Sequence, residues 1–300
     1  MTRILCVGIA VVDFVFRFPA VPCAPGKHIA RSLEPVLGGM AANGAITALR
    51  LGGEAALMSR LGADPNGVFA LAELRSHGLD VSAVEVDAEA PTSLSAVAVA
   101  DDGERLLFNH QDSRLLIDVP SPPPAAFGRF DAVLVDTCWP AAGVTALQLA
   151  AERGVAGVAD LDHQIEQRWL RPTLRAASHV VLSSEGLADC LGVDGLEAGI
   201  AEARRLTPGL VAVTLGPDGV VWADGDSLRR IPAFPVRAVD TLGAGDVFHG
   251  ALTLALAEAR SWPDALLFAT AAAAVKCSRP SGRGSFPNRG DVAALLATRR

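Results

Sequence analysis

Aromatic residues and cysteines are both scarce in this chain. It contains no tyrosine, and aromatic residues make up only 5% of its 300 residues. The cysteines lie far apart, are odd in number and include no CxxC pair, which disfavours a disulfide framework and a zinc site. We therefore expect reduced thiols and a cytoplasmic protein. The five cysteines are Cys6, Cys23, Cys138, Cys190 and Cys277.

Long apolar runs and an excess of positive charge are absent as well. The longest uncharged apolar run, ALLFATAAAAV at 265–275, is shorter than the roughly 18 residues that a membrane span requires. The opening MTRILCVGIAVVD is interpreted as a buried first strand rather than a signal peptide, because Asp13 ends its apolar run and no small-residue cleavage site follows. A formal net charge of -7 disfavours binding to nucleic acid. We expect a small-molecule partner and neither a membrane nor a nucleic-acid partner.

The second half of the chain predicts the fold class. Short Val/Leu/Ala strands at 131–138, 155–161, 179–184 and 209–216 are interspersed with helical patterns such as 141–154. This alternation is typical of a three-layer α/β/α domain with a mostly parallel central sheet. Half of the residues are hydrophobic, which is enough for one large domain over residues 1–300.

Two other segments predict a small accessory sheet. Residues 14–36 contain short alternating runs broken by prolines and Gly26. Residues 92–111 contain two alternating runs around Asp102-Gly103, a strong hairpin signal. We expect these strands to form a lid over the main domain. Its apolar face and open edges predict a homodimer through the lid strands.

The stretch VDTLGAGDVFHGALTLALA at 239–257 predicts a site for an anion. Its apolar spacing indicates a helix that begins near Gly245. The glycines allow close approach to the backbone, and the first helical amides point outward at the positive end of the helix dipole. There, Asp246 can accept a proton from an incoming hydroxyl while the amides hold charge on a transferring phosphoryl group. The alternative is a tight turn followed by an acidic residue that only stabilises the helix start.

Two rival nucleotide motifs are missing. No GxxxxGK followed by Ser or Thr occurs, and GAGDVF lacks the last glycine of a dinucleotide fingerprint. A P-loop and a Rossmann site are therefore disfavoured.

Several motifs resemble those of the ribokinase-like, or PfkB, family of carbohydrate and nucleoside kinases. DTLGAGDVFHGAL resembles the family signature, and VLGGMAANGAITALRLG resembles the amino-terminal di-glycine motif. SRLGADPNGVFALAELRSHGLDVS, VTLGPDGV and AAAAVKCSRPSGRGSFP are similar to further family segments. The resemblance extends through most of the chain and implies the ribokinase-like fold with a small β-sheet lid.

The resemblance also implies roles for individual residues. Asp246 would be the catalytic base, and ATP with Mg²⁺ the phosphoryl donor. The anion-hole amides would belong to Gly243, Ala244 and Gly245. The nucleotide would contact Thr214, Gly216, Gly219 and the loop that begins at Arg283. The sugar acceptor would be held by Asp13, Gly39 and Asn43, with Gly26 and Asn109 as candidates for reading its far end.

Two departures from the family pattern concern metal ions. The family's Asn-x-x-Glu motif for hydrated magnesium corresponds here to VLSSEGL, which has no Asn and only Glu185 as a carboxylate. Asp240 is a candidate ligand of a monovalent cation such as K⁺, although Leu242 stands where many relatives have Thr.

The identity of the acceptor stays open at this point. Local motifs are closest to the sulfofructose kinase and ketohexokinase-like branch, which favours a ketohexose-like sugar. A sulfonated sugar is less favoured, because Cys138 stands where an arginine would bind the sulfonate. A nucleoside kinase would need an aromatic slot near the lid. A catalytically slow sugar- or nucleotide-binding protein is the alternative outside the enzymes.

Overall fold

A large, mostly parallel sheet is the centre of the fold. The computed structural model describes residues 1–101, 103–161, 165–280 and 282–299. Within these residues the main sheet has nine strands in the order β13-β12-β11-β10-β9-β8-β1-β4-β5. Neighbouring strands are parallel except at one edge, where β11, β12 and β13 pair antiparallel. The strands are β1 (Arg3–Val7), β4 (Glu54–Gly62), β5 (Asp80–Asp87), β8 (Ala132–Val135), β9 (Ala156–Leu161), β10 (His179–Ser183), β11 (Leu210–Thr214), β12 (Val220–Asp224) and β13 (Ser227–Ile231).

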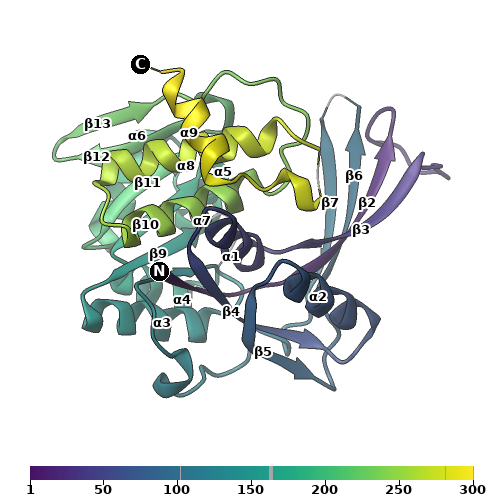
Figure 1. The fold of residues 1–300 in the computed structure, drawn as a ribbon, viewed down its shortest axis with the longest axis horizontal. Helices are drawn as coiled ribbons and strands as arrows, with labels where there is room; N and C mark the ends of the chain where they lie inside the picture. Colours follow the sequence, from purple (N-terminus) through teal and green to yellow (C-terminus); the bar gives the residue numbers. More distant parts are fainter. Residues whose placement is uncertain (102, 162–164, 281, 300) are drawn as a thin grey trace.

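Helices cover both faces of this sheet (Figure 1). Side chains alternate between the faces, so Ile4 and Cys6 of β1 pack in the core beneath α1, α7 and α8, whereas Leu5 and Val7 pack in the core with α3. The three-layer fold that the sequence predicts is thus confirmed. No helix in the described ranges is both long and apolar enough to span a bilayer. The helices are α1 (Met40–Arg50), α2 (Pro65–Ser76), α3 (Pro140–Arg153), α4 (Gln167–Ala176), α5 (Ser184–Leu191), α6 (Leu196–Leu206), α7 (Ala244–Ala257), α8 (Trp262–Cys277) and α9 (Arg289–Ala297), with short 3-10 helices η1 (Pro124–Phe127), η2 (Gly216–Asp218) and η3 (Arg283–Ser285).

A separate four-stranded sheet lies to one side of the main body (Figure 1). It consists of β3 (Ser32–Gly38), β2 (Val11–Phe18), β6 (Leu94–Ala100) and β7 (Arg105–His110), in that order. The β2–β6 pair is parallel, and the other two pairs are antiparallel. Both segments that predict an accessory sheet, 14–36 and 92–111, contribute to it. Asp102 of the predicted hairpin turn lies outside the described residues.

The prediction of one first strand through residue 13 is wrong. β1 ends at Val7, and β2 begins at Val11 in the other sheet. The chain turns at Gly8, whose φ is 149°. A Cβ atom there would lie 2.1 Å from the carboxylate of Asp136. The buried apolar run therefore continues through both sheets, and the turn between them has room only for a glycine at position 8.

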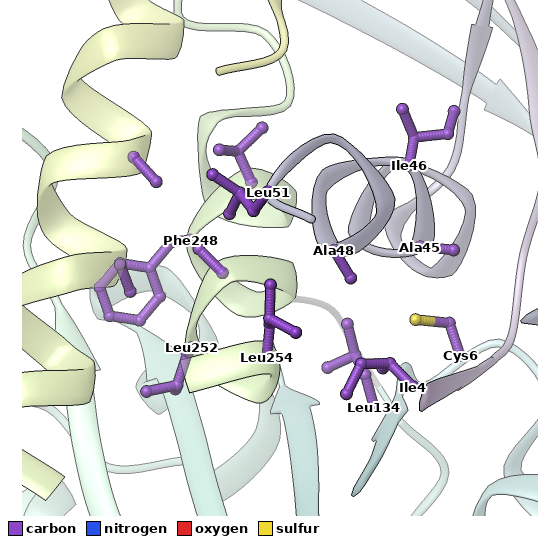
Figure 2. Close-up of a cluster of buried hydrophobic side chains, with 14 of the residues drawn as sticks. Ile4, Cys6, Ala45, Ile46, Ala48, Leu51, Leu134, Phe248, Leu252 and Leu254 are labelled. Carbon is purple, nitrogen blue, oxygen red and sulfur yellow. The ribbon is translucent and has the colours of Figure 1, made fainter. Parts of the chain in front are cut away.

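Helices α1 and α7 cross at two glycines, Gly44 and Gly250. A Cβ atom on Gly250 would lie 2.3 Å from the carbonyl oxygen of Gly44, so the two backbones touch directly. Figure 2 shows Leu254 of α7 and Ala48 of α1 near this crossing, above Leu134 of the sheet. Residues 247–255 of α7 are all buried, because this part of the helix lies between the sheet, α1 and α8.

We predict that Gly250→Ala destabilises the protein by about 1–3 kcal/mol, because the added methyl group pushes α1 away from α7. Gly143→Ala on α3 is the matched control. A Cβ atom at Gly143 meets its nearest neighbour at 3.5 Å, and replacing a helical glycine should leave stability unchanged or raise it by up to about 1 kcal/mol. Urea unfolding of both variants measures the difference. Equal stabilities would contradict the direct backbone contact.

Candidate active site

The amino-terminal turn of α7 has the features of an anion site. Gly243 precedes the helix with φ 75°, a left-handed conformation that glycine adopts without strain. In the described part of the chain, the N–H groups of Gly243 and Gly245 donate no hydrogen bond, whereas that of Ala244 donates to the carbonyl of Thr241 at 3.2 Å. Two of the three predicted amides are thus available at the positive end of the helix dipole.

Asp246 lies in the same turn and is held by a residue from α1. The side-chain Nδ2 of Asn43 donates to Oδ2 of Asp246 at 2.7 Å. Asn43 itself is largely buried, and its backbone N–H donates to the carbonyl of Gly39 at 2.9 Å. The helix crossing therefore brings together a predicted acceptor-binding residue and the predicted base, which are 203 positions apart.

Asp13 is a buried carboxylate on β2. Burial raises its pKa to about 6, a hydrogen bond with Ser95 opposes the rise, and the negative charge of Asp246 adds to it. The two glycines of the di-glycine motif, Gly38 and Gly39, have no space for a side chain. A Cβ atom on Gly38 would lie 2.1 Å from Oδ2 of Asp13, and one on Gly39, whose φ is 103°, would lie 2.5 Å from a carbonyl of the β1–β2 connection. Both glycines are required by close contacts.

A row of polar residues crosses the second sheet from Asp13. Asp13 of β2 is in register with Ser95 of β6, which is in register with Asn109 of β7. Residues paired in this way point to the same face of a sheet, so the predicted Asn109 shares a face with Asp13. Gly26 does not belong to this group, because it lies exposed in the β2–β3 connection.

A pocket opens beside the turn of α7. Asp13, Asn43 and Gly243 line it, so the structure places these three predicted residues around one space. Its remaining lining residues include Phe69, Glu73 and His77 from α2, and Leu242, Lys276, Gly282, Ser285 and Phe286 from the carboxy-terminal third of the chain. Gly26 and Asn109 are not among the lining residues.

Three of the residues predicted to bind the nucleotide lie at or just after the carboxyl end of β11, and none of the three lines this pocket. Thr214 ends β11, and Gly216 begins η2 with φ 54°. Gly219 has φ 93°, and a Cβ atom there would lie 2.0 Å from the carbonyl of Ile231, so this glycine is required by the turn itself. Arg283 begins η3, but its side chain lies outside the described residues.

Asp136 is a buried carboxylate that the sequence-based prediction missed. It follows β8, which neighbours β1 at the point where the strand order reverses, and such a switch point is the usual ligand crevice of an open α/β sheet. Here a buried carboxylate lies at that point. It accepts from the N–H groups of Ile9 at 2.8 Å, Cys138 at 2.8 Å and Ala41 at 3.2 Å. The only sequence signal was an aspartate directly after a buried strand.

Asp240 was predicted as a candidate ligand for a monovalent cation, and its surroundings do not fit one. The Nζ of Lys276 donates to its carbonyl at 3.5 Å, and the guanidinium of Arg17 lies 3.5 Å from its Oδ2. The backbone N–H of Leu242 donates to its Oδ1 at 2.9 Å. A potassium ion would face two positively charged side chains here. Lys276 was also missed, because a lysine on an alanine-rich helix gives no sign of burial.

Glu185, the predicted magnesium-associated carboxylate, lies exposed in the first turn of α5. No group of three or more His, Cys, Asp or Glu side chains that could hold a metal ion occurs within the described residues. Mg²⁺ is commonly held by substrate phosphates, water and one or two carboxylates, and a single exposed glutamate fits such a site.

We predict that Asp136→Ala lowers the free energy of unfolding by about 2 kcal/mol or more, because buried N–H groups lose their acceptor. Burial raises the pKa of Asp136 to about 6, three backbone donors oppose the rise, and the charge of Asp246 adds to it. The acid form is therefore favoured by folding, and the contribution of this carboxyl falls as the pH rises from about 4 to about 6. Urea unfolding should show a larger loss at pH 5 than at pH 8. The exposed Asp226→Asn is the control, and a loss that does not change with pH would contradict the raised pKa.

Comparison with known proteins identifies the family. The pfkB family carbohydrate kinase model matches residues 1–289. A fructokinase from Klebsiella pneumoniae is 33% identical over 88% of this chain and 87% of its own length. The crystal structure of a proposed ribokinase from Agrobacterium tumefaciens is 32% identical, with a TM-score of 0.91 over 100% of this chain and 99% of that chain. An Arabidopsis thaliana ribokinase complexed with ribose and ATP, 22% identical, shares the fold with a TM-score of 0.84 over 99% of both chains. The chain therefore belongs to the pfkB family of ATP-dependent carbohydrate kinases, as its sequence motifs predict.

Proposed function

We propose that this kinase transfers the γ-phosphoryl group of ATP to a primary hydroxyl group of a sugar, with Asp246 as the general base. The observation that carries the proposal is the position of Asp246 in the first turn of α7, held by Asn43 beside the N–H groups of Gly243 and Gly245. The acceptor hydroxyl gives its proton to the Asp246 carboxylate as its oxygen bonds to phosphorus. The bond from phosphorus to the β–γ bridging oxygen breaks, and ADP leaves. The helix-start amides stabilise charge on the transferring group.

The acceptor side of the proposal rests on Asp13 and Asn43. A carboxylate accepts hydrogen bonds from two neighbouring hydroxyl groups, and an amide can both donate and accept. Both residues line the pocket beside Gly243, and Asn109 lies in the row that continues from Asp13. We favour a ketohexose-like acceptor, in agreement with the fructokinase from Klebsiella pneumoniae.

The aromatic lining of the pocket also supports a second acceptor class. No aromatic slot is predicted from the few aromatic residues near the lid, yet Phe69 and Phe286 line the pocket. The His77 ring packs edge-on against Phe286 at a centroid distance of 5.8 Å. A flat apolar group such as a nucleobase could lie against these rings. Nucleosides therefore belong in the substrate panel beside ketoses.

On the donor side, we propose that ATP lies along Thr214, Gly216 and Gly219, with its phosphates directed toward α7. Mg²⁺ bound to the phosphates would neutralise their charge, and Glu185 would hold one of its waters. These residues follow β10 and β11 on the carboxyl side of the sheet, the side from which α7 presents its amides.

The second sheet is proposed as the interface of a homodimer. Its edge strand β7 is exposed along its full length, and the side chain of Phe108 is 63% exposed beside Leu107 at 41%. An exposed apolar edge strand is usually covered by another strand or subunit.

We predict that the protein elutes as a dimer of its 31.0 kDa chain in size-exclusion chromatography with light scattering. Phe108→Asp should shift it to the monomer, because the charge would be buried in the interface. Leu228→Asp, at an exposed leucine of β13, is the control and should remain dimeric. A monomeric unmutated chain at micromolar concentration would contradict the proposal.

We predict that Asp246→Asn lowers sugar-dependent ATP turnover by about 100-fold or more, because the general base is lost. Glu197→Gln changes an exposed acidic residue in the first turn of another helix, α6, and should leave turnover unchanged. The assay uses Mg²⁺ with ketoses, aldoses, sugar acids, 6-sulfofructose and nucleosides. Nearly full turnover in Asp246→Asn would contradict the role of the base. Sugar binding without turnover in the unmutated protein would favour a binding protein instead.

A further inference from the structure

A buried lysine stands beside the proposed phosphoryl-transfer site. Lys276 is in the last turn of α8, is only 3% exposed, and lines the same pocket as Gly243. The chain has only two lysines, and the other, Lys27, is exposed. Burying an ammonium group is costly unless opposite charge compensates it. A role for the positive charge of Lys276 beside the site would explain why the protein buries this ammonium group.

The backbone fixes Lys276 close to the loop that leads into α7. The N–H groups of Val239 and Asp240 both donate to the carbonyl of Cys277, at 2.7 and 3.2 Å. The Nζ of Lys276 in turn donates to the carbonyl of Asp240 at 3.5 Å. Only Thr241 and Leu242 separate Asp240 from Gly243 in the sequence. The ammonium group is therefore anchored on the loop that presents the anion-binding amides.

The pKa of Lys276 lies below its ordinary value, chiefly because burial disfavours the charged ammonium group. The negative charges of Asp240 and Asp246 oppose this lowering, and the positive charge of Arg105 adds to it. Arg17 also faces the carboxylate of Asp240, at 3.5 Å. Positive charge from the protein thus already surrounds Asp240, the residue at which the sequence predicted a monovalent cation.

We propose that the ammonium group of Lys276 supplies the positive charge that a monovalent cation would supply beside the anion site, so that phosphoryl transfer by this protein does not depend on potassium. Lys276 is a positioning residue in this proposal. It acts on the transferring group through the Asp240 loop and through its field at the α7 turn. The inference rests on the proposed function for its kinetic test, but the occupancy of the cation site can be tested separately.

The kinetic test compares sugar-dependent ATP turnover in potassium chloride and in choline chloride. The unmutated protein should have the same kcat in both salts, within about twofold. Lys276→Met should lose at least about tenfold in kcat in choline chloride and regain much of it in potassium chloride, because a free ion can then take the vacated place. Arg204→Met, which removes an exposed cation from the last turn of α6, is the control and should behave like the unmutated protein in both salts.

Thermal unfolding gives a readout that needs no substrate. The Tm of the unmutated protein should be the same in both salts, whereas potassium should raise the Tm of Lys276→Met by binding the folded state. Lys276→Gln serves as a second variant if the methionine variant does not fold. Potassium dependence of the unmutated protein, or a folded Lys276→Met that potassium neither stabilises nor reactivates, would overturn the proposal. Failure of the unmutated protein on every acceptor would refute the proposed function instead and leave the Tm comparison valid.

Discussion

The direct backbone contact between α1 and α7 at Gly44 and Gly250 is the constraint on which the site depends. It lets two helices from opposite ends of the chain begin at nearly the same place. Asn43, one residue before Gly44, thereby reaches the carboxylate of Asp246, one turn before Gly250. A larger side chain at Gly250 would separate the helices and lengthen the hydrogen bond that orients the proposed base.

Charge balance is the second organising feature of this region. Asp13, Asp136 and Asp246 place negative charge close together, and the charge of Asp246 contributes to the raised pKa values of the other two. Two helix amino termini face these carboxylates, because Asp136 accepts from the first turn of α1 and Asp246 lies in the first turn of α7. Lys276 and Arg17 add positive charge beside Asp240, in the loop that leads into α7. The region therefore combines proton-accepting groups with groups that attract phosphate.

Much of this arrangement could be predicted from the sequence. The strand and helix periods gave the layered fold, and the glycines before Asp246 marked the helix start, because both signals are local. Contacts between segments far apart in the sequence were harder to predict, because no local pattern indicates them. The apolar run around Gly8 has the pattern of one strand. The need for glycine there becomes visible only in the structure, where Asp136 occupies the space beside it. Lys276 reads as an ordinary helix residue until packing buries it, and the rings of Phe69 and Phe286 come together from opposite ends of the chain.

The structure of a complex with fructose and a non-hydrolysable ATP analogue would test the central claim most directly. The primary hydroxyl of the sugar should lie within hydrogen-bonding distance of the Asp246 carboxylate, with the terminal phosphoryl group against the N–H groups of Gly243 and Gly245 and the Asn43 contact intact. A sugar bound with its primary hydroxyl away from Asp246, or phosphates placed away from the α7 turn, would contradict it.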